Sequence, residues 1–261
     1  MKAIEIIIPA LIVGIIGLVA GVGLSLASKF MAVPVDEKQE KVRSALPGAT
    51  CGACGYSGCD GYAAAVAAGE AEPNKCAPGG ATAAAALAEI LGVEVETEPK
   101  IAFIACNGTP EKTKTKFNYD GLQSCTAASL VNAGPIECEY GCIGFGDCAN
   151  ACPFGAITIE NGRPVVCGDI CVGCGKCTKV CPKSLISIVP KSAKVRVACS
   201  NKSKGAPVVK MCGVSCIACK MCEKACESGA VKVVDNVAVI DQSLCTACGK
   251  CKEACKRGVI V

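Results

Sequence analysis

The stretch CVGCGKCTKVCP, residues 171–182, decides the fold, because its four cysteines follow the spacing C-x2-C-x2-C-x3-C. The same spacing recurs in residues 216–226 and 245–255, and a looser C-x3-C-x5-C-x3-C run occupies residues 138–152. Repetition of one pattern indicates that one small structural unit is used several times. The four runs comprise Cys138, Cys142, Cys148, Cys152, Cys171, Cys174, Cys177, Cys181, Cys216, Cys219, Cys222, Cys226, Cys245, Cys248, Cys251 and Cys255.

This spacing is typical of [4Fe–4S] clusters, in which three cysteines of a run hold one cluster and the fourth binds the neighbouring cluster. Four runs therefore predict four clusters in two pairs. The predicted ligand sets are Cys138, Cys142, Cys148 and Cys181; Cys171, Cys174, Cys177 and Cys152; Cys216, Cys219, Cys222 and Cys255; and Cys245, Cys248, Cys251 and Cys226. The first run has the loosest spacing, so a [3Fe–4S] cluster or a looser loop is the alternative there.

The composition supports metal binding rather than disulfides. The chain has 25 cysteines in 261 residues, and disulfide frameworks do not repeat one spacing four times. Histidine is absent, which excludes His-ligated zinc, His-ligated haem and catalytic Cys–His or Ser–His pairs. With five Phe, four Tyr and no Trp the apolar core must be small, so clusters would act as staples. A net charge of +4 gives no reason to expect nucleic-acid binding.

A further four-cysteine group lies in residues 47–95, where Cys51, Cys54, Cys59 and Cys76 have the spacing C-x2-C-x4-C-x16-C. Glycines between the first three cysteines let the backbone turn tightly around a bound group. Ala-rich stretches flank the fourth cysteine and are expected to form helices. The group predicts a fifth [4Fe–4S] cluster, with a structural zinc site as the alternative.

The N-terminus is predicted to be a single transmembrane anchor, residues 1–29, followed by a linker, residues 30–46. The apolar stretch 6–27 is long enough, as a helix, to cross a hydrocarbon layer about 30 Å thick. A cleaved signal peptide is the alternative, but its apolar region would be shorter. Four basic residues between Lys29 and Arg43 favour a cytoplasmic location for the cysteine-rich part, where thiols stay reduced.

The rest of the chain divides into a strand–helix connecting element, residues 100–135, and two ferredoxin-type domains. The first domain spans residues 136–190; the second, with a connecting strand before it, spans residues 194–261. Each fourth cysteine leads into a turn and an apolar strand, as in CPFGAITI at 152–159. The predicted fold is α+β: one N-terminal transmembrane helix, a small helical four-Cys [4Fe–4S] module and two bacterial 2[4Fe–4S] ferredoxin-like domains.

Five cysteines lie outside the predicted sets: Cys106, Cys125, Cys167, Cys199 and Cys212. Buried free thiols, which pack as small apolar groups, are the simplest interpretation. However, KIAFIACN at 100–107 resembles KVRVACS at 194–200. The alternative is therefore an additional, sixth cluster site formed between the two copies by Cys106, Cys125, Cys199 and Cys212. Cys167 is expected to have no role.

Three longer motifs carry a resemblance to a known family. They are LPGATCGACGYSGCDGYAAAVAAGEAEPNKCAPGG at 46–80, YGCIGFGDCANACPFGAI at 140–157 and CVGCGKCTKVCPKSLI at 171–186. In this order, after an apolar N-terminus, they resemble the B subunit of the Rnf complex, an ion-translocating ferredoxin:NAD+ oxidoreductase. The resemblance implies that electrons enter from soluble reduced ferredoxin and pass to other subunits of a membrane complex that exports Na+ or H+.

Two other functions remain open. One is an electron feeder for a corrinoid or carbon monoxide enzyme, whose proteins share the four-Cys module; the other is a non-redox protein stapled by clusters or zinc. The sequence has no dinucleotide-binding G-x-G-x-x-G after a strand, no P-loop and no flavin attachment motif. We therefore expect a translocase subunit without bond-making catalytic residues, held in the cell membrane with its iron–sulfur domains in the cytoplasm.

A cluster of lysines is the candidate docking site for acidic ferredoxin. Lys202, Lys204 and Lys210 lie close together in the sequence, and complementary charge speeds the association of electron-transfer partners. A solvated surface loop is the simpler interpretation of the same residues.

Overall fold

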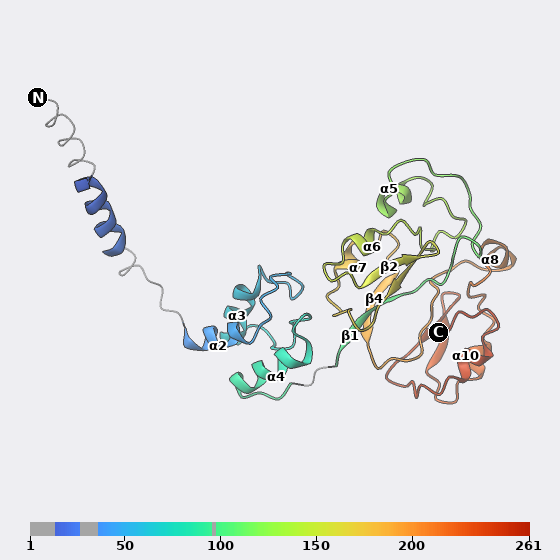
Figure 1. The fold of residues 1–261 in the computed structure, drawn as a ribbon. Coiled ribbons are helices and arrows are strands. Elements are labelled where there is room, and N and C mark those ends of the chain that lie inside the picture. Colours follow the sequence, from blue (N-terminus) through green and yellow to red (C-terminus); the bar gives the residue numbers. More distant parts are fainter. Residues whose placement is uncertain (1–13, 27–35, 96–97) are drawn as a thin grey trace, which may run out of the picture.

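The computed structural model describes residues 14–26, 36–95 and 98–261. Residues 14–26 form an exposed helix set apart from the rest of the molecule (Figure 1). In the described part of the chain, no helix combines the length and apolar composition needed to cross a membrane. The predicted anchor, residues 1–29, lies partly outside the described residues and stays a prediction.

The four-Cys module is built from three helices, α2 (Glu37–Ser44), α3 (Cys59–Ala67) and α4 (Gly80–Leu91). The Asp36 carboxylate caps α2 by accepting a hydrogen bond from the Lys38 backbone N–H at 2.9 Å. The helices pack on a common core that includes Val42, Tyr62, Val66 and Leu87. Helix α2 lies in the range predicted to be a linker, yet its Val42 is completely buried, so α2 belongs to the module.

The connecting element contributes a strand to the first ferredoxin domain. Strand β1 (Lys100–Ile104) pairs antiparallel with β4 (Ile186–Pro190), with Ala102 opposite Ile188. The chain then runs outward to the short helix α5 (Cys125–Leu130), which projects from the body of the domain in Figure 1. The predicted strand and helix of this element are therefore both present, and the strand closes the edge of the next domain.

The first ferredoxin domain contains a hairpin and two short helices that follow cysteine loops. Strands β2 (Ile157–Glu160) and β3 (Arg163–Val166) pair antiparallel, and α6 (Asp147–Asn150) and α7 (Lys176–Val180) place their cysteines inside. The buried core is thin and is shared between apolar and cysteine side chains: Ala102, Ile104, Cys148, Ile157, Cys177 and Ile186. Such a core depends on whatever the cysteines bind.

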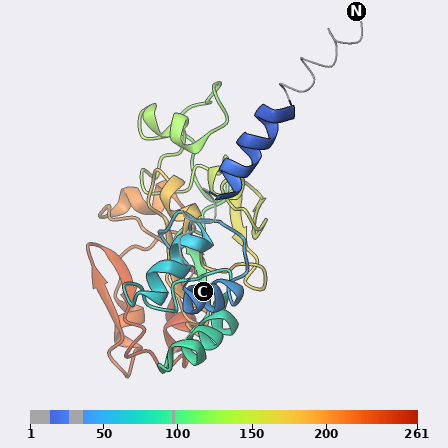
Figure 2. The ribbon, with the colours of Figure 1, turned by 90° about the vertical axis from the view of Figure 1, so that its left-hand side faces the viewer.

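The second ferredoxin domain repeats this plan. It contains α9 (Met221–Lys224), the antiparallel hairpin of β5 (Val231–Val234) and β6 (Val237–Ile240), and α10 (Lys250–Ala254). Helix α8 (Ala206–Met211) precedes it. Figure 2 shows this domain, in orange and red, lying to one side of the yellow strands of the first domain. The described residues thus form the mixed helix and strand fold that the sequence predicts.

The two domains differ at their edge strand. In the second domain the connecting strand forms only a single bridge, between Val197 and Ile260, where the first domain has the full β1–β4 pair. A second bridge, between Thr113 and Cys212, joins the connecting element to the start of the second domain. The connecting element therefore touches both ferredoxin domains.

Candidate iron–sulfur centres

We call a cage any four cysteines whose side chains surround one space. In the four-Cys module, Cys59 begins α3 and Cys76 precedes α4, and both are buried. Burial raises the pKa of Cys76, and the nearby thiolate charges of Cys59, Cys54 and Cys51 raise it further. Cys59 and Cys76 belong to the apolar core of the module, and Cys54 packs against it. A bound cluster would supply the positive iron charge that stabilises such buried thiolates.

The backbone beside this cage leaves no room for a side chain. A Cβ atom at Gly79 would lie 3.1 Å from the Cys76 sulfur and would overlap the Ala83 Cβ atom. The sequence Pro78-Gly79-Gly80 therefore lets α4 begin immediately beside the fourth cysteine.

One cage of the first ferredoxin domain has the predicted composition. Cys152, Cys171, Cys174 and Cys177 line a cavity of about 300 Å³. The Ala102 N–H donates a hydrogen bond to the Cys171 sulfur at 3.3 Å, and the Ala156 N–H donates to the Cys152 sulfur at 3.4 Å. Backbone N–H donors of this kind stabilise the negative charge of an iron–sulfur cluster and raise its potential.

The other cage of this domain differs from the predicted set. Cys125, Cys142, Cys148 and Cys181 line a cavity of about 360 Å³, so Cys125 takes the place predicted for Cys138. The Leu185 N–H donates to the Cys181 sulfur at 3.5 Å. Burial raises the pKa of Cys148 to about 11, and the thiolate charges of Cys125 and Cys181 contribute to the increase.

Asp147 explains how a cysteine from outside the domain reaches this cage. Its carboxylate accepts hydrogen bonds from the backbone N–H groups of Cys125 and Thr126, both at 3.0 Å, and from the Ser124 hydroxyl at 2.9 Å. Partial burial opposes ionisation, but these donors hold the pKa of Asp147 below its usual value. Because Asp147 directly precedes Cys148, it fixes the start of α5 beside the cage.

The second ferredoxin domain brings together the four cysteines of one predicted set, and Cys226, Cys245 and Cys251 of the other lie near one another. Cys216, Cys219, Cys222 and Cys255 line a cavity of about 370 Å³. Burial raises the pKa of Cys222 to about 11, with Cys216 and Cys255 adding to the increase. In the other cage, burial and then the charges of Cys226 and Cys245 raise the pKa of Cys251. A salt bridge between Glu227 and Lys250 joins the two loops of that cage.

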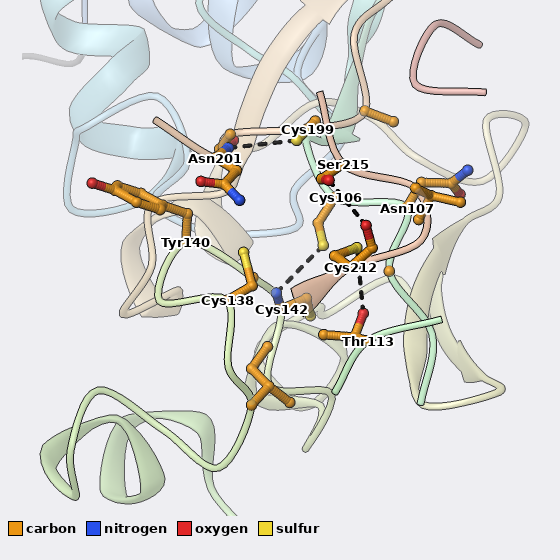
Figure 3. Close-up of a pocket in the computed structure, with 16 residues that line it drawn as sticks. Cys106, Asn107, Thr113, Cys138, Tyr140, Cys142, Cys199, Asn201, Cys212 and Ser215 are labelled. Carbon is orange, nitrogen blue, oxygen red and sulfur yellow. Dashed lines mark hydrogen bonds between the residues drawn. The ribbon is translucent and has the colours of Figure 1, made fainter. Parts of the chain in front are cut away.

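A further cavity of about 360 Å³ lies between the two domains and is lined by cysteines of both (Figure 3). Its cysteine side chains are those of Cys106, Cys138, Cys199 and Cys212, and Cys142 lies beside them. Burial raises the pKa of Cys138 to about 12, and the charges of Cys106, Cys199 and Cys212 contribute to the increase. Three of the four cysteines predicted for the extra site thus meet with Cys138, whereas the fourth, Cys125, belongs to the neighbouring cage.

Two observations complete the geometry. Cys167 is exposed. Within residues 14–26, 36–95 and 98–261, no three or more His, Cys, Asp or Glu side chains lie close enough together to hold a single metal ion.

Three segments match known iron–sulfur families. Residues 46–78 match a family described as "Putative Fe-S cluster", residues 140–185 match a 4Fe-4S dicluster domain, and residues 238–261 match a 4Fe-4S binding domain. The matches confirm iron–sulfur domains of ferredoxin type. Cys138 and all four leftover cysteines of the proposed extra site lie outside the three matched segments.

Curated relatives agree over most of the chain. It is 42% identical to the B subunit of the "Proton-translocating ferredoxin:NAD(+) oxidoreductase complex" of Clostridium ljungdahlii, over 92% of this chain and 86% of that protein. The chain belongs to the family of Rnf complex B subunits. It is also 42% identical to the B subunit of the Na(+)-translocating complex of Acetobacterium woodii, over 77% of this chain and 61% of that longer protein. The B subunit of the "Ion-translocating oxidoreductase complex" of Methanosarcina acetivorans is 38% identical over 88% of each chain. The resemblance seen in the sequence is confirmed.

One signal in this Rnf-type sequence could have identified Cys125. Counted back from Cys152 with the spacing of the other runs, the four positions are 142, 145, 148 and 152, and position 145 is Phe145. The first run is therefore a standard run that lacks its second cysteine, rather than a stretched run that begins at Cys138. A missing ligand requires a cysteine from elsewhere, and the structure provides Cys125.

Proposed function

We propose that this chain is the multi-cluster electron-transfer subunit of a membrane-bound complex that couples electron flow from reduced ferredoxin to NAD+ with Na+ or H+ translocation. The proposal is carried by one observation: cysteine cages follow one another through three linked domains, in a chain 42% identical to named subunits of such complexes. In this role the chain is an oxidoreductase subunit and makes or breaks no covalent bond itself.

The chain's own residues would bind and tune the redox groups. Bound clusters supply one-electron carriers. The thiolates hold the iron, while N–H groups such as those of Ala102, Ala156 and Leu185 donate to cage sulfurs and favour the reduced state. Four cysteine thiolates are the usual donor set of a [4Fe–4S] cluster, so the proposal is five such clusters, with Cys125 in place of Cys138 in one.

The membrane and partner assignments complete the proposal. The N-terminal segment anchors the chain as a single pass in the cell membrane, and the iron–sulfur domains lie in the cytoplasm beside the other subunits. For the docking of ferredoxin, Lys204 and Lys210 are the better candidates, because the Lys202 ammonium already pairs with Asp235 at 3.2 Å. An iron–sulfur feeder for a corrinoid or carbon monoxide enzyme is not favoured by the relatives found.

Purification of the complex from detergent-solubilised membranes tests this function. The chain should purify with several membrane subunits and should be reduced by ferredoxin, with the reduced clusters observed by EPR. Cys171→Ala, which removes a ligand of a predicted cage, should abolish ferredoxin-dependent NAD+ reduction, whereas Cys167→Ala, at an exposed cysteine, should leave it unchanged. A chain that purifies alone or with a corrinoid protein would contradict the proposal.

A further inference from the structure

The cavity between the two ferredoxin domains is bounded by cysteines from four separate segments of the chain (Figure 3). Cys106 follows strand β1, and Cys138 precedes the loop of the first domain. Cys199 lies in the connecting strand of the second domain, and Cys212 follows helix α8. The fold thus brings together four thiols that lie far apart in the sequence. Free thiols without a shared role would have no reason to meet.

This cavity is lined in the same way as the cages beside it. Like the Cys125 cage and the Cys216 cage, it is bounded by cysteine side chains from separate segments of the chain. Cys138 and Cys212 are buried, and only part of Cys106 and Cys199 is exposed. Four of its cysteines belong to no other cage, and four cysteines are the ligand set of the [4Fe–4S] clusters proposed in those cages.

Polar donors point at the sulfur atoms of this cavity. The Cys142 N–H donates to the Cys106 sulfur at 3.4 Å, and the Thr113 hydroxyl donates to the Cys212 sulfur at 3.6 Å. The Cys199 sulfur accepts two hydrogen bonds, from the N–H groups of Cys216 at 3.4 Å and Asn201 at 3.5 Å. Hydrogen bonds to sulfur are a recurring feature of iron–sulfur sites, because they stabilise the charge of the thiolate ligands.

The backbone also approaches this cavity closely. A Cβ atom at Gly108 would lie 2.7 Å from the Thr113 hydroxyl oxygen, 3.6 Å from the Cys106 sulfur and 3.9 Å from the Cys212 sulfur. Gly108 therefore lies between two of the thiols and beside the hydroxyl that donates to one of them. A glycine at this position lets the loop wrap around the space that the cysteines enclose.

Cys138 is available for this cavity because the adjoining cage does not need it. Cys125, Cys142, Cys148 and Cys181 already supply four thiols to the first domain. Without Cys167, the sixteen cysteines of the four runs and the other four leftover cysteines therefore divide into five sets of four, with the four-Cys module as the sixth.

We propose that Cys106, Cys138, Cys199 and Cys212 bind a sixth [4Fe–4S] cluster, and that Cys125 rather than Cys138 completes the cage of Cys142, Cys148 and Cys181. The new site would hold a one-electron carrier between the two ferredoxin domains. One electron arrives from one side and one leaves to the other, with no bond made or broken and no proton moved.

Two hydrogen bonds connect this site to a cage in each domain. Cys142 contributes its thiol to the first-domain cage and its N–H to the Cys106 sulfur. Cys216 contributes its thiol to the second-domain cage and its N–H to the Cys199 sulfur. The sixth cluster is therefore joined by one residue to each neighbour, which gives electrons a route between the domains.

Iron and acid-labile sulfide content of the full-length chain, purified in detergent and reconstituted without oxygen, tests the proposal. The wild-type chain should hold about 24 iron and 24 sulfide atoms. The double variant Cys106→Ser/Cys199→Ser should lose about four of each. Cys167→Ser is the matched control and should keep the wild-type content. An unchanged content in the double variant, or zinc in place of iron and sulfide at this site, would overturn the proposal.

The iron content of the wild-type chain tests the sixth cluster even if the double variant fails to accumulate. A fully loaded chain with about 20 iron atoms would hold five clusters, and this result would also overturn the proposal. EPR of the reduced chain tests the exchange of ligands. Cys138→Ala should leave the magnetic coupling between the two first-domain clusters intact, and Cys125→Ala should remove it; the reverse result would contradict the assignment. Iron content does not depend on the electron donor, so failure here is distinguishable from failure of the proposed function.

Discussion

The two ferredoxin domains obtain the cysteines of their cages in different ways. The second domain has two complete runs with the standard spacing, and the cysteines of the Cys216 cage come from these runs alone. The first domain has Phe145 where a cysteine would stand and obtains Cys125 from the connecting element. A run with all its cysteines can fill a cage from its own domain. A run that lacks one cysteine needs a cysteine from another part of the chain, and here the contact made by Asp147 holds that cysteine in place.

The same difference has a consequence for the neighbouring site. Because Cys125 enters the first domain, Cys138 remains free to face Cys106, Cys199 and Cys212. The first domain's run that lacks its second cysteine is thus accompanied by an additional set of cysteines between the domains. The second domain, whose runs are complete, contributes only the flanking Cys199 and Cys212 to that set.

The largest expected effect comes from removing the recruited ligand. Cys125→Ala should cost the first domain one cluster, about four iron atoms per chain. Phe145→Cys should restore the standard spacing, so the double variant Cys125→Ala/Phe145→Cys should recover the lost iron. Iron analysis and EPR of the reduced chains measure both results.

The second domain supplies the control for this rescue. Cys219→Ala removes the second cysteine of a standard run, and no leftover cysteine lines that cage, so about four iron atoms should be lost. If Cys125→Ala retained all its iron while Cys219→Ala lost its share, Cys125 would not be a ligand.

A smaller effect is expected from the carboxylate that positions Cys125. Asp147→Ala removes the acceptor for the N–H groups of Cys125 and Thr126, and should destabilise the first domain by about 1–3 kcal/mol. The matched position before the third cysteine of the second domain's first run is Met221, whose side chain is partly exposed. Met221→Ala should have a much smaller effect. Unfolding followed by loss of cluster absorbance compares the two variants, and equal losses would refute the role of Asp147.

These residues show which parts of the molecule could be predicted from sequence. The standard runs place their first three cysteines within seven residues of one another, and the four cysteines predicted around Cys216 line one cavity. The grouping around Cys138 could not be predicted in the same way. It depends on Asp147 holding the distant Cys125, a contact across 22 residues that leaves no periodic signal.

Helix α2 gives a second instance. Its sequence, EKQEKVRS, is almost entirely polar, and polarity alone favours a solvated linker. Its single apolar residue, Val42, is nevertheless completely buried in the core of the four-Cys module. One apolar side chain at the right position is enough to attach this helix to the module. The average composition of a polar segment does not reveal such a residue.

The site between the domains offers an intermediate test. Gly108→Ala would place a methyl group 2.7 Å from the Thr113 hydroxyl oxygen and should displace the donor of the Cys212 sulfur. We expect a destabilisation of about 1–3 kcal/mol and a shifted EPR signal for one cluster, with the iron content retained. Gly168→Ala is the control, because its added Cβ would meet only Ile101, at 3.9 Å. Identical behaviour of the two variants would show that Gly108 has no special place beside the sulfurs.

The smallest effect should come from the surface of the second domain. Lys250 pairs with Glu227 between the two loops of one cage, and the hydrogen bond and charge of each lower the pKa of Glu227 and raise that of Lys250. Both side chains are largely exposed, so solvent and salt screen the pair. Lys250→Met should lower the Tm slightly at low salt, and the difference from wild type should disappear in concentrated salt. A large, salt-independent loss would mean that the pair holds the cage loops together, and that the second domain, like the first, depends on a contact outside its cysteine pattern.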